Sequence, residues 1–65
     1  GGLAMTYDEQ NALVPGDSVI FPWAEVATVT KYRFYGTMQW LPALRFNDGE
    51  VYPMSSFCPE DMTKL

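Results

Sequence analysis

Residues 44–52 read Leu-Arg-Phe-Asn-Asp-Gly-Glu-Val-Tyr and carry the strongest structural signal in the chain. Asn, Asp and Gly readily adopt the backbone angles of a tight turn, and the flanking residues are aliphatic, aromatic or β-branched. The pattern predicts two antiparallel strands joined by a turn at residues 47–49. This β-hairpin favours an all-β fold for the whole chain.

Short β-rich segments and turn residues make up most of the remaining chain. Pro15 and Gly16 form a type II turn pair, with Gly16 at the position that needs a positive φ. The predicted strands cover residues 18–21, 26–35, 38–46, 50–52 and 62–64, and one 3₁₀ turn at residues 55–58 precedes the last of them. Pro42 falls inside the third strand and cannot donate a ladder hydrogen bond, so we expect it at an edge or a bulge.

The second predicted strand has no purely apolar face. One alternating set is Ala27, Val29, Lys31 and Arg33, and the other is Val26, Thr28, Thr30, Tyr32 and Phe34. A bulge at residues 30–31 would shift the alternation by one residue and turn both Val29 and Tyr32 inward. We therefore predict a bent second strand.

The N-terminal residues have a different composition. Residues 1–4 precede Met5 and resemble the remnant of an expression tag, with Met5 as the natural start. Thr6 and Glu9 have the spacing of a capping box, which favours a single helical turn. Because the apolar periodicity is too short to sustain a helix, we expect residues 1–12 to form a flexible arm and residues 13–65 to form the folded domain.

The predicted elements together resemble a small Src-homology-3-like barrel of the KOW or Tudor kind. The matching segments are Pro15-Gly16-Asp17-Ser18-Val19, Ala27-Thr28-Val29-Thr30-Lys31 and Leu44-Arg45-Phe46-Asn47-Asp48-Gly49. The resemblance implies a five-stranded barrel over residues 13–64. It implies no specific function, because many functions share this architecture.

The residue inventory argues against an enzyme. The chain has no histidine, so it offers neither a Ser-His nor a Cys-His nucleophile pair, and a structural zinc site is disfavoured. No glycine-rich phosphate loop occurs. Cys58 is the only cysteine, which excludes an internal disulfide, and we expect it to be a half-buried structural thiol. We predict a non-catalytic protein without a metal or cofactor.

Charge and hydrophobicity point to protein partners. The net charge of −4 disfavours non-specific binding to duplex nucleic acid. Hydrophobic residues make up 48% of the chain and charged residues 18%, so apolar surface is expected to remain for a protein or peptide partner or a second copy. The chain has no apolar run of about 20 residues for a membrane span. A lone cysteine favours a reducing compartment, and we expect a cytoplasmic protein.

Ten of the 65 residues are aromatic, more than the interior of one small barrel can hold. We expect Phe21, Phe46 and Phe57 inside. In Tudor-like and Src-homology-3-like barrels, loop aromatics form a ligand groove, which implies recognition of proline-rich segments or, beside an acid, of methylated cations. The candidate ligand-binding residues are Trp23, Tyr32, Tyr35, Trp40, Tyr52, Asp48 and Glu50. Alternatively, Trp23 and Trp40 seal the two ends of the barrel and bind nothing.

Two other functions remain open. Lys31, Arg33 and Arg45, with aromatic residues interleaved, could form a nucleic-acid-binding patch of the KOW kind, or simply be solvated partners of nearby acids. The segment Glu50-Val51-Tyr52-Pro53 is similar to the Gln-Ile-Tyr pore segment of type II, plasmid-borne dihydrofolate reductases, which are tetramers of tiny barrels. Glutamate replaces the glutamine of that segment, which argues against folate binding.

Overall fold

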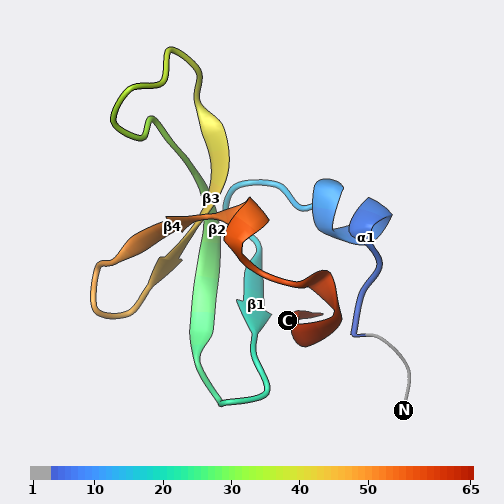
Figure 1. The fold of residues 1–65 in the computed structure, drawn as a ribbon. Helices are drawn as coiled ribbons and strands as arrows, with labels where there is room; N and C mark the ends of the chain where they lie inside the picture. Colours follow the sequence, from blue (N-terminus) through green and yellow to red (C-terminus); the bar gives the residue numbers. More distant parts are fainter. Residues whose placement is uncertain (1–3) are drawn as a thin grey trace.

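The structure is a computed structural model that describes residues 4–65. Its elements are α1 (Tyr7–Asn11), β1 (Ser18–Ile20), β2 (Val26–Tyr32), β3 (Leu41–Phe46), β4 (Val51–Pro53), the 3₁₀ turns η1 (Met54–Ser56) and η2 (Pro59–Asp61), and β5 (Thr63–Lys64). The five strands form one antiparallel sheet in the order β4-β3-β2-β1-β5 (Figure 1). The all-β prediction is confirmed, as are the central hairpin and a 3₁₀ turn before the last strand. The predicted tag remnant lies, except for Ala4, outside the described residues.

The sheet is open, so the predicted closed barrel is wrong. Among the described residues β4 pairs only with β3, and β5 pairs only with β1. These outer strands contain three and two residues respectively. Closure requires tilted strands long enough to pair along both edges, and strands this short do not provide that length.

The central strands pair without a bulge. The register of β2 and β3 runs unbroken from Ala27 opposite Phe46 to Tyr32 opposite Leu41. The predicted bulge at residues 30–31 is therefore wrong, and Tyr32 is exposed while Val29 is buried. No bulge is needed to turn Lys31 and Arg33 away from the core, because the core ends at Val29 and the strand continues past it into solvent.

Pro42 is tolerated within β3 because of where β4 ends. The Phe46 N–H donates to the Glu50 C=O (2.9 Å) on the β4 side of the strand. By alternation, the ring nitrogen of Pro42, four residues earlier, faces the same side. The β4 ladder ends at Pro53, opposite Ala43, so Pro42 lies just past it and its missing N–H removes no ladder bond.

Two hairpin loops share one design. In the β3–β4 loop, the Phe46 C=O accepts from the Gly49 N–H (2.9 Å), and Gly49 has a φ of 87°. In the β1–β2 loop, the Phe21 C=O accepts from the Ala24 N–H (2.9 Å), and Ala24 has a φ of 69°. Both are three-residue loops that end in a left-handed residue, a position that favours glycine. Ala24 therefore holds a strained backbone conformation.

Replacing Ala24 by glycine is expected to stabilise the protein. Left-handed backbone costs a non-glycine residue about 1–2 kcal/mol, and the greater freedom of glycine in the unfolded chain offsets part of that gain. We expect a net increase of about 0.5–1 kcal/mol in the free energy of unfolding, measured by urea denaturation. The matched variant Gly49→Ala should shift stability by a similar amount in the opposite direction. A lower free energy of unfolding in Ala24→Gly would contradict the inference that the Ala24 backbone is strained.

One face of the sheet carries the core. Val19 pairs with Ala27 and Val29 pairs with Leu44, and all four are buried on this face. The segments that cover the face contribute Met5, Phe21, Met54 and Met62, all buried. The core is thus completed by residues from both ends of the chain.

The N-terminal segment belongs to this core. The predicted capping box is confirmed: the Glu9 N–H donates to Thr6 Oγ1 (3.1 Å) and the Thr6 N–H donates to Glu9 Oε1 (2.9 Å). Gln10 is buried, and its Nε2 donates to the Phe57 carbonyl oxygen (3.3 Å). With Met5 also buried, the structure places this segment within the folded body and not in an arm beside it.

The segment between β2 and β3 projects from the body (Figure 1). It lengthens the molecule, whose principal extents are 39 × 26 × 18 Å. The Thr37 side chain orders the loop, because its Oγ1 donates to the Phe34 carbonyl (3.0 Å) and lies 3.2 Å from the Gln39 carbonyl. We call residues 31–40, which comprise the last two residues of β2 and the loop after it, the projecting arm.

Candidate functional site

An aromatic hollow of about 370 Å³ lies where the two hairpin loops meet the 3₁₀ segment. Its lining residues are Trp23, Glu25, Phe46, Asp48, Tyr52, Ser56 and Phe57. We call this hollow the aromatic groove. Its size falls within the range of about 300–1,000 Å³ typical of ligand pockets, and its apolar walls with a few polar groups are typical of binding sites.

Stacked rings build the walls of the groove. Phe21 is buried beneath it, and the Trp23 indole stacks on Phe21 with centroids 4.8 Å apart and planes 16° apart. Tyr52 stands edge-on to Phe46 (5.8 Å) and to Phe57 (6.2 Å). Because the rings hold one another in place, Trp23 and Tyr52 are positioned before any ligand arrives, although 52% and 45% of their surfaces are exposed.

Two carboxylates line the groove, one beside each hairpin loop. Glu25 follows the strained Ala24 and immediately precedes β2. Asp48 lies in the β3–β4 turn, where its Oδ1 accepts from the Glu50 N–H (2.9 Å). No Lys or Arg is among the lining residues. A groove with electron-rich ring faces and two acids favours a positively charged side chain over an anion.

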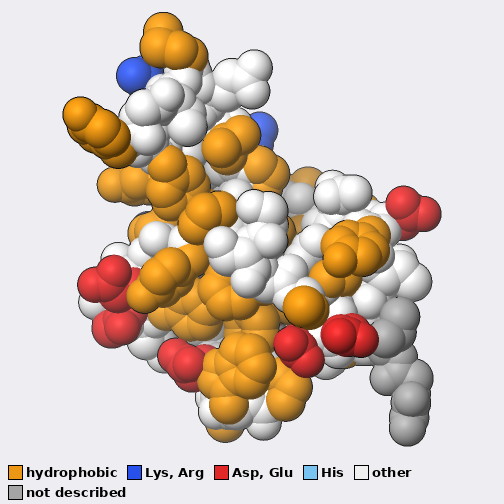
Figure 2. All heavy atoms as spheres, in the orientation of Figure 1, with side chains coloured by type: hydrophobic (Ala, Val, Ile, Leu, Met, Phe, Trp, Pro, Cys, Tyr) orange, Lys and Arg blue, Asp and Glu red, His pale blue; other side chains and the backbone are white. Residues whose placement is uncertain are grey.

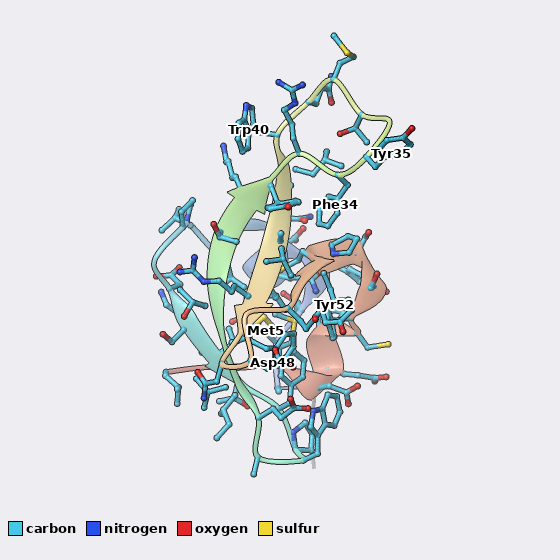
Figure 3. All side chains as sticks on the ribbon, turned by 90° about the vertical axis from the view of Figure 1, so that its left-hand side faces the viewer. Met5, Phe34, Tyr35, Trp40, Asp48 and Tyr52 are labelled. Carbon is cyan, nitrogen blue, oxygen red and sulfur yellow. The ribbon has the colours of Figure 1, made fainter. Side chains whose placement is uncertain are left out.

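The projecting arm carries a second set of exposed apolar side chains. Tyr35, Met38 and Trp40 lie on it, with Tyr35 fully exposed and Met38 and Trp40 exposed over 89% and 63% of their surfaces. Tyr32 contacts Phe34 at the base of the arm, with centroids 5.0 Å apart. Figure 3 shows Tyr35 and Trp40 pointing to opposite sides of the arm, far from Asp48 and Tyr52.

The predicted ligand-binding residues therefore divide into two groups. Trp23, Tyr52 and Asp48 meet in the groove, whereas Tyr32, Tyr35 and Trp40 lie on the arm. Glu50 belongs to neither group: it is exposed just before β4, it is not among the lining residues of the groove, and its backbone N–H donates to Asp48 Oδ1. Neither tryptophan is a buried plug, because each exposes more than half of its surface.

Sequence reasoning missed four lining residues: Glu25, Phe46, Ser56 and Phe57. The segment Phe-Pro-Trp-Ala-Glu at residues 21–25 parallels Phe-Asn-Asp-Gly-Glu at residues 46–50, which indicates a second hairpin loop. The parallel does not place Glu25 in the groove, because the equivalent Glu50 lies outside it. Phe57 was expected inside, and it is only partly buried because one side of its ring faces the groove. Phe21 and Phe46 are buried as predicted.

The three bases of the nucleic-acid hypothesis do not form one surface. Lys31 is opposite Pro42, and Arg45 is opposite Thr28. Alternation along the strands puts these two side chains on opposite faces of the sheet, about 10 Å apart along the strand direction. Only Lys31 and Arg33 remain together, at the base of the projecting arm.

Three further features of residues 4–65 bear on whether there is a second site: the lone cysteine, possible metal ligands and a larger hollow. Cys58 is exposed, so the expectation of a half-buried thiol is wrong. Within residues 4–65, no group of His, Cys, Asp or Glu has the arrangement of a metal site. A larger hollow of about 480 Å³ lies between α1 and η1, but its lining contains no charged side chain that would select a ligand.

Comparison of the chain with models of protein families, with curated proteins and with solved structures finds no match. None of the helices in the described part of the chain is long and apolar enough to cross a membrane.

Proposed function

We propose that this protein is a non-catalytic binding module that recognises a protein or peptide segment through the aromatic groove. The observation that carries this proposal is the convergence of Trp23 from the β1–β2 loop, Asp48 from the β3–β4 turn and Tyr52 from β4 on one preformed hollow. An exposed apolar patch rimmed by polar groups is typical of interaction surfaces. Exposed tryptophan and tyrosine are also the residues that most often dominate binding energy at such surfaces.

The lining chemistry specifies the type of segment. A flat apolar or aromatic side chain fits against Trp23 and Phe57, while a neighbouring Lys or Arg fits the carboxylates of Glu25 and Asp48. A cation over an indole face gains about 0.5–2 kcal/mol. We therefore infer a ligand that presents a cationic and an apolar side chain side by side.

The order β4-β3-β2-β1-β5 with a 3₁₀ turn before β5 supports an open relative of the Src-homology-3-like barrel. In this reading the groove is bounded by the β1–β2 loop, the β3–β4 turn and the 3₁₀ segment. Loop-built sites of this kind tolerate changes in ligand without changes in the sheet.

The test is selection of peptides displayed on phage. A library of random 12-residue peptides selected on the protein is expected to yield sequences with an Arg or Lys next to an aromatic or aliphatic residue. Synthetic copies should bind with at least tenfold lower affinity to Trp23→Ala, because loss of a central indole removes about 2 kcal/mol. Isothermal titration calorimetry measures both affinities.

Tyr7→Ala is the control. It removes an aromatic side chain that is 70% exposed and lies outside the groove and outside the projecting arm, so the affinity of the selected peptides should change less than twofold. Selection of no peptides, or peptides that bind Trp23→Ala as well as the original protein, would contradict the proposal.

A further inference from the structure

Charge is strongly segregated along this chain. Three of the four basic residues, Lys31, Arg33 and Arg45, lie within residues 26–47, and none of the eight acidic residues does. That segment therefore carries a formal charge of +3, and the rest of the chain carries −7. Figure 2 shows the result on one face: Lys and Arg side chains appear only on the upper projection, and Asp and Glu side chains appear on the body below.

The projecting arm carries positive charge beside an aromatic ring, whereas the groove carries negative charge beside aromatic rings. Tyr32 is the last residue of β2 and pairs with Leu41, so Arg33 and Trp40 leave the ladder at neighbouring positions. The base of the arm thus presents a cation beside an indole that is 63% exposed. The groove presents stacked rings beside two carboxylates.

The projecting arm also exposes several large apolar side chains. Tyr35, Met38 and Trp40 expose most of their apolar surface within one short segment. Although Tyr35 and Trp40 point to opposite sides, this density of exposed apolar side chains on one projecting segment favours a surface that a partner covers. In Figure 3 Tyr35 and Trp40 lie well above Asp48 and Tyr52, so these arm side chains are away from the groove of their own copy.

We propose that the occupant of the groove is the projecting arm of a second copy of this chain, with Arg33 and Trp40 entering between Trp23 and the two carboxylates. This inference rests on the proposed function, since it names the segment that the groove binds. If the second arm returns to the first groove, the two equal contacts give a closed dimer with two-fold symmetry. If it does not, the contact is heterologous and gives a ring or a longer assembly.

Sedimentation velocity of the full chain tests the contact through charge reversal. The protein is expected to associate between about 10 μM and 1 mM at low salt, and raising the salt to about 0.5 M should weaken association because the charges are screened. Arg33→Glu and Glu25→Lys should each weaken it at least tenfold. The double variant, with both changes in one chain, should recover most of the affinity because the pair is restored with opposite polarity.

The design separates contact from folding. Neither Arg33 nor Glu25 is buried, and recovery in the double variant shows that neither change unfolds the protein. Arg45→Glu, at an exposed base on the sheet outside the arm, is the matched control and should leave association within twofold of the original. An equimolar mixture of Arg33→Glu and Glu25→Lys should also associate, since one copy supplies an intact arm and the other an intact groove.

A protein that stays monomeric at 1 mM overturns the proposal, as does a double variant no better than either single one, or an Arg45→Glu effect equal to that of Arg33→Glu. If the monomeric protein still binds phage-selected peptides through Trp23, the arm is the wrong occupant and the proposed function stands. If the protein binds neither a second copy of itself nor the selected peptides, both proposals fail.

Discussion

Replacing Phe21 by alanine is expected to leave little folded protein at 25 °C. Phe21 is 3% exposed, and its ring contacts Trp23, Phe46 and Phe57 with centroid distances of 4.8, 5.8 and 5.2 Å. Truncation of a buried phenylalanine costs about 3–5 kcal/mol. A domain of fewer than about 70–80 residues rarely has more than 3–5 kcal/mol of stability from one core. Circular dichroism in a urea titration measures the loss.

Phe21→Leu separates the structural role from the support of the groove. Leucine is smaller than phenylalanine but fills much more of the site than alanine does, so this variant should lose only about 1–2 kcal/mol and remain mostly folded. It removes the ring on which Trp23 stacks, and peptide affinity should fall even though the protein remains folded. An alanine variant at position 21 that loses less than about 1 kcal/mol would show that the aromatic cluster is not the centre of the core.

Local signals predicted the turns and strands well. The Asp17 N–H donates to the Val14 C=O (3.0 Å), and Gly16 has a φ of 99°, as the Pro-Gly pair predicts for a type II turn. The β3–β4 hairpin closes at Gly49. These features depend on the conformational preferences of one or two residues, and those preferences follow directly from the residue types.

Closure and strand alternation depend on distant contacts and were predicted wrongly. A bulge in β2 was inferred because Lys31 and Arg33 share a face with Ala27 and Val29. That inference assumed that the whole strand lies over the core, whereas the core ends at Val29 and the rest extends into the projecting arm. Where a core ends is a property of packing and not of local periodicity.

The candidate site was predicted in part for the same reason. Surplus aromatic content indicated that several rings stay exposed, and Trp23 and Tyr52 do so in the groove. The sequence could not divide the exposed rings into two surfaces, because that division follows from the length of the projecting arm. Glu25 was missed because its position in the groove depends on the β1–β2 loop, whose left-handed residue is an alanine and so lacks the usual glycine signal.

Removal of residues 1–11 is the second change with a large expected effect. It tests whether the N-terminal segment is part of the core or a flexible extension. Met5 is 4% exposed within the core, and truncation of a buried methionine costs about 2–5 kcal/mol. Gln10 adds hydrogen bonds from Nε2 to the Phe57 carbonyl (3.3 Å) and to Met62 Sδ (3.3 Å). We expect the shortened chain to lose at least about 3 kcal/mol, measured by urea denaturation.

Point variants assign the loss to burial and not to chain length. Met5→Ala should reproduce most of it, whereas Tyr7→Ala, at a side chain that is 70% exposed in the same segment, should change stability by less than about 0.5 kcal/mol. The position of Phe57 links this segment to function, because Gln10 holds the backbone of a residue that lines the groove. If the shortened chain were as stable as the original and bound peptides equally well, the N-terminal segment would be shown to lie outside the core.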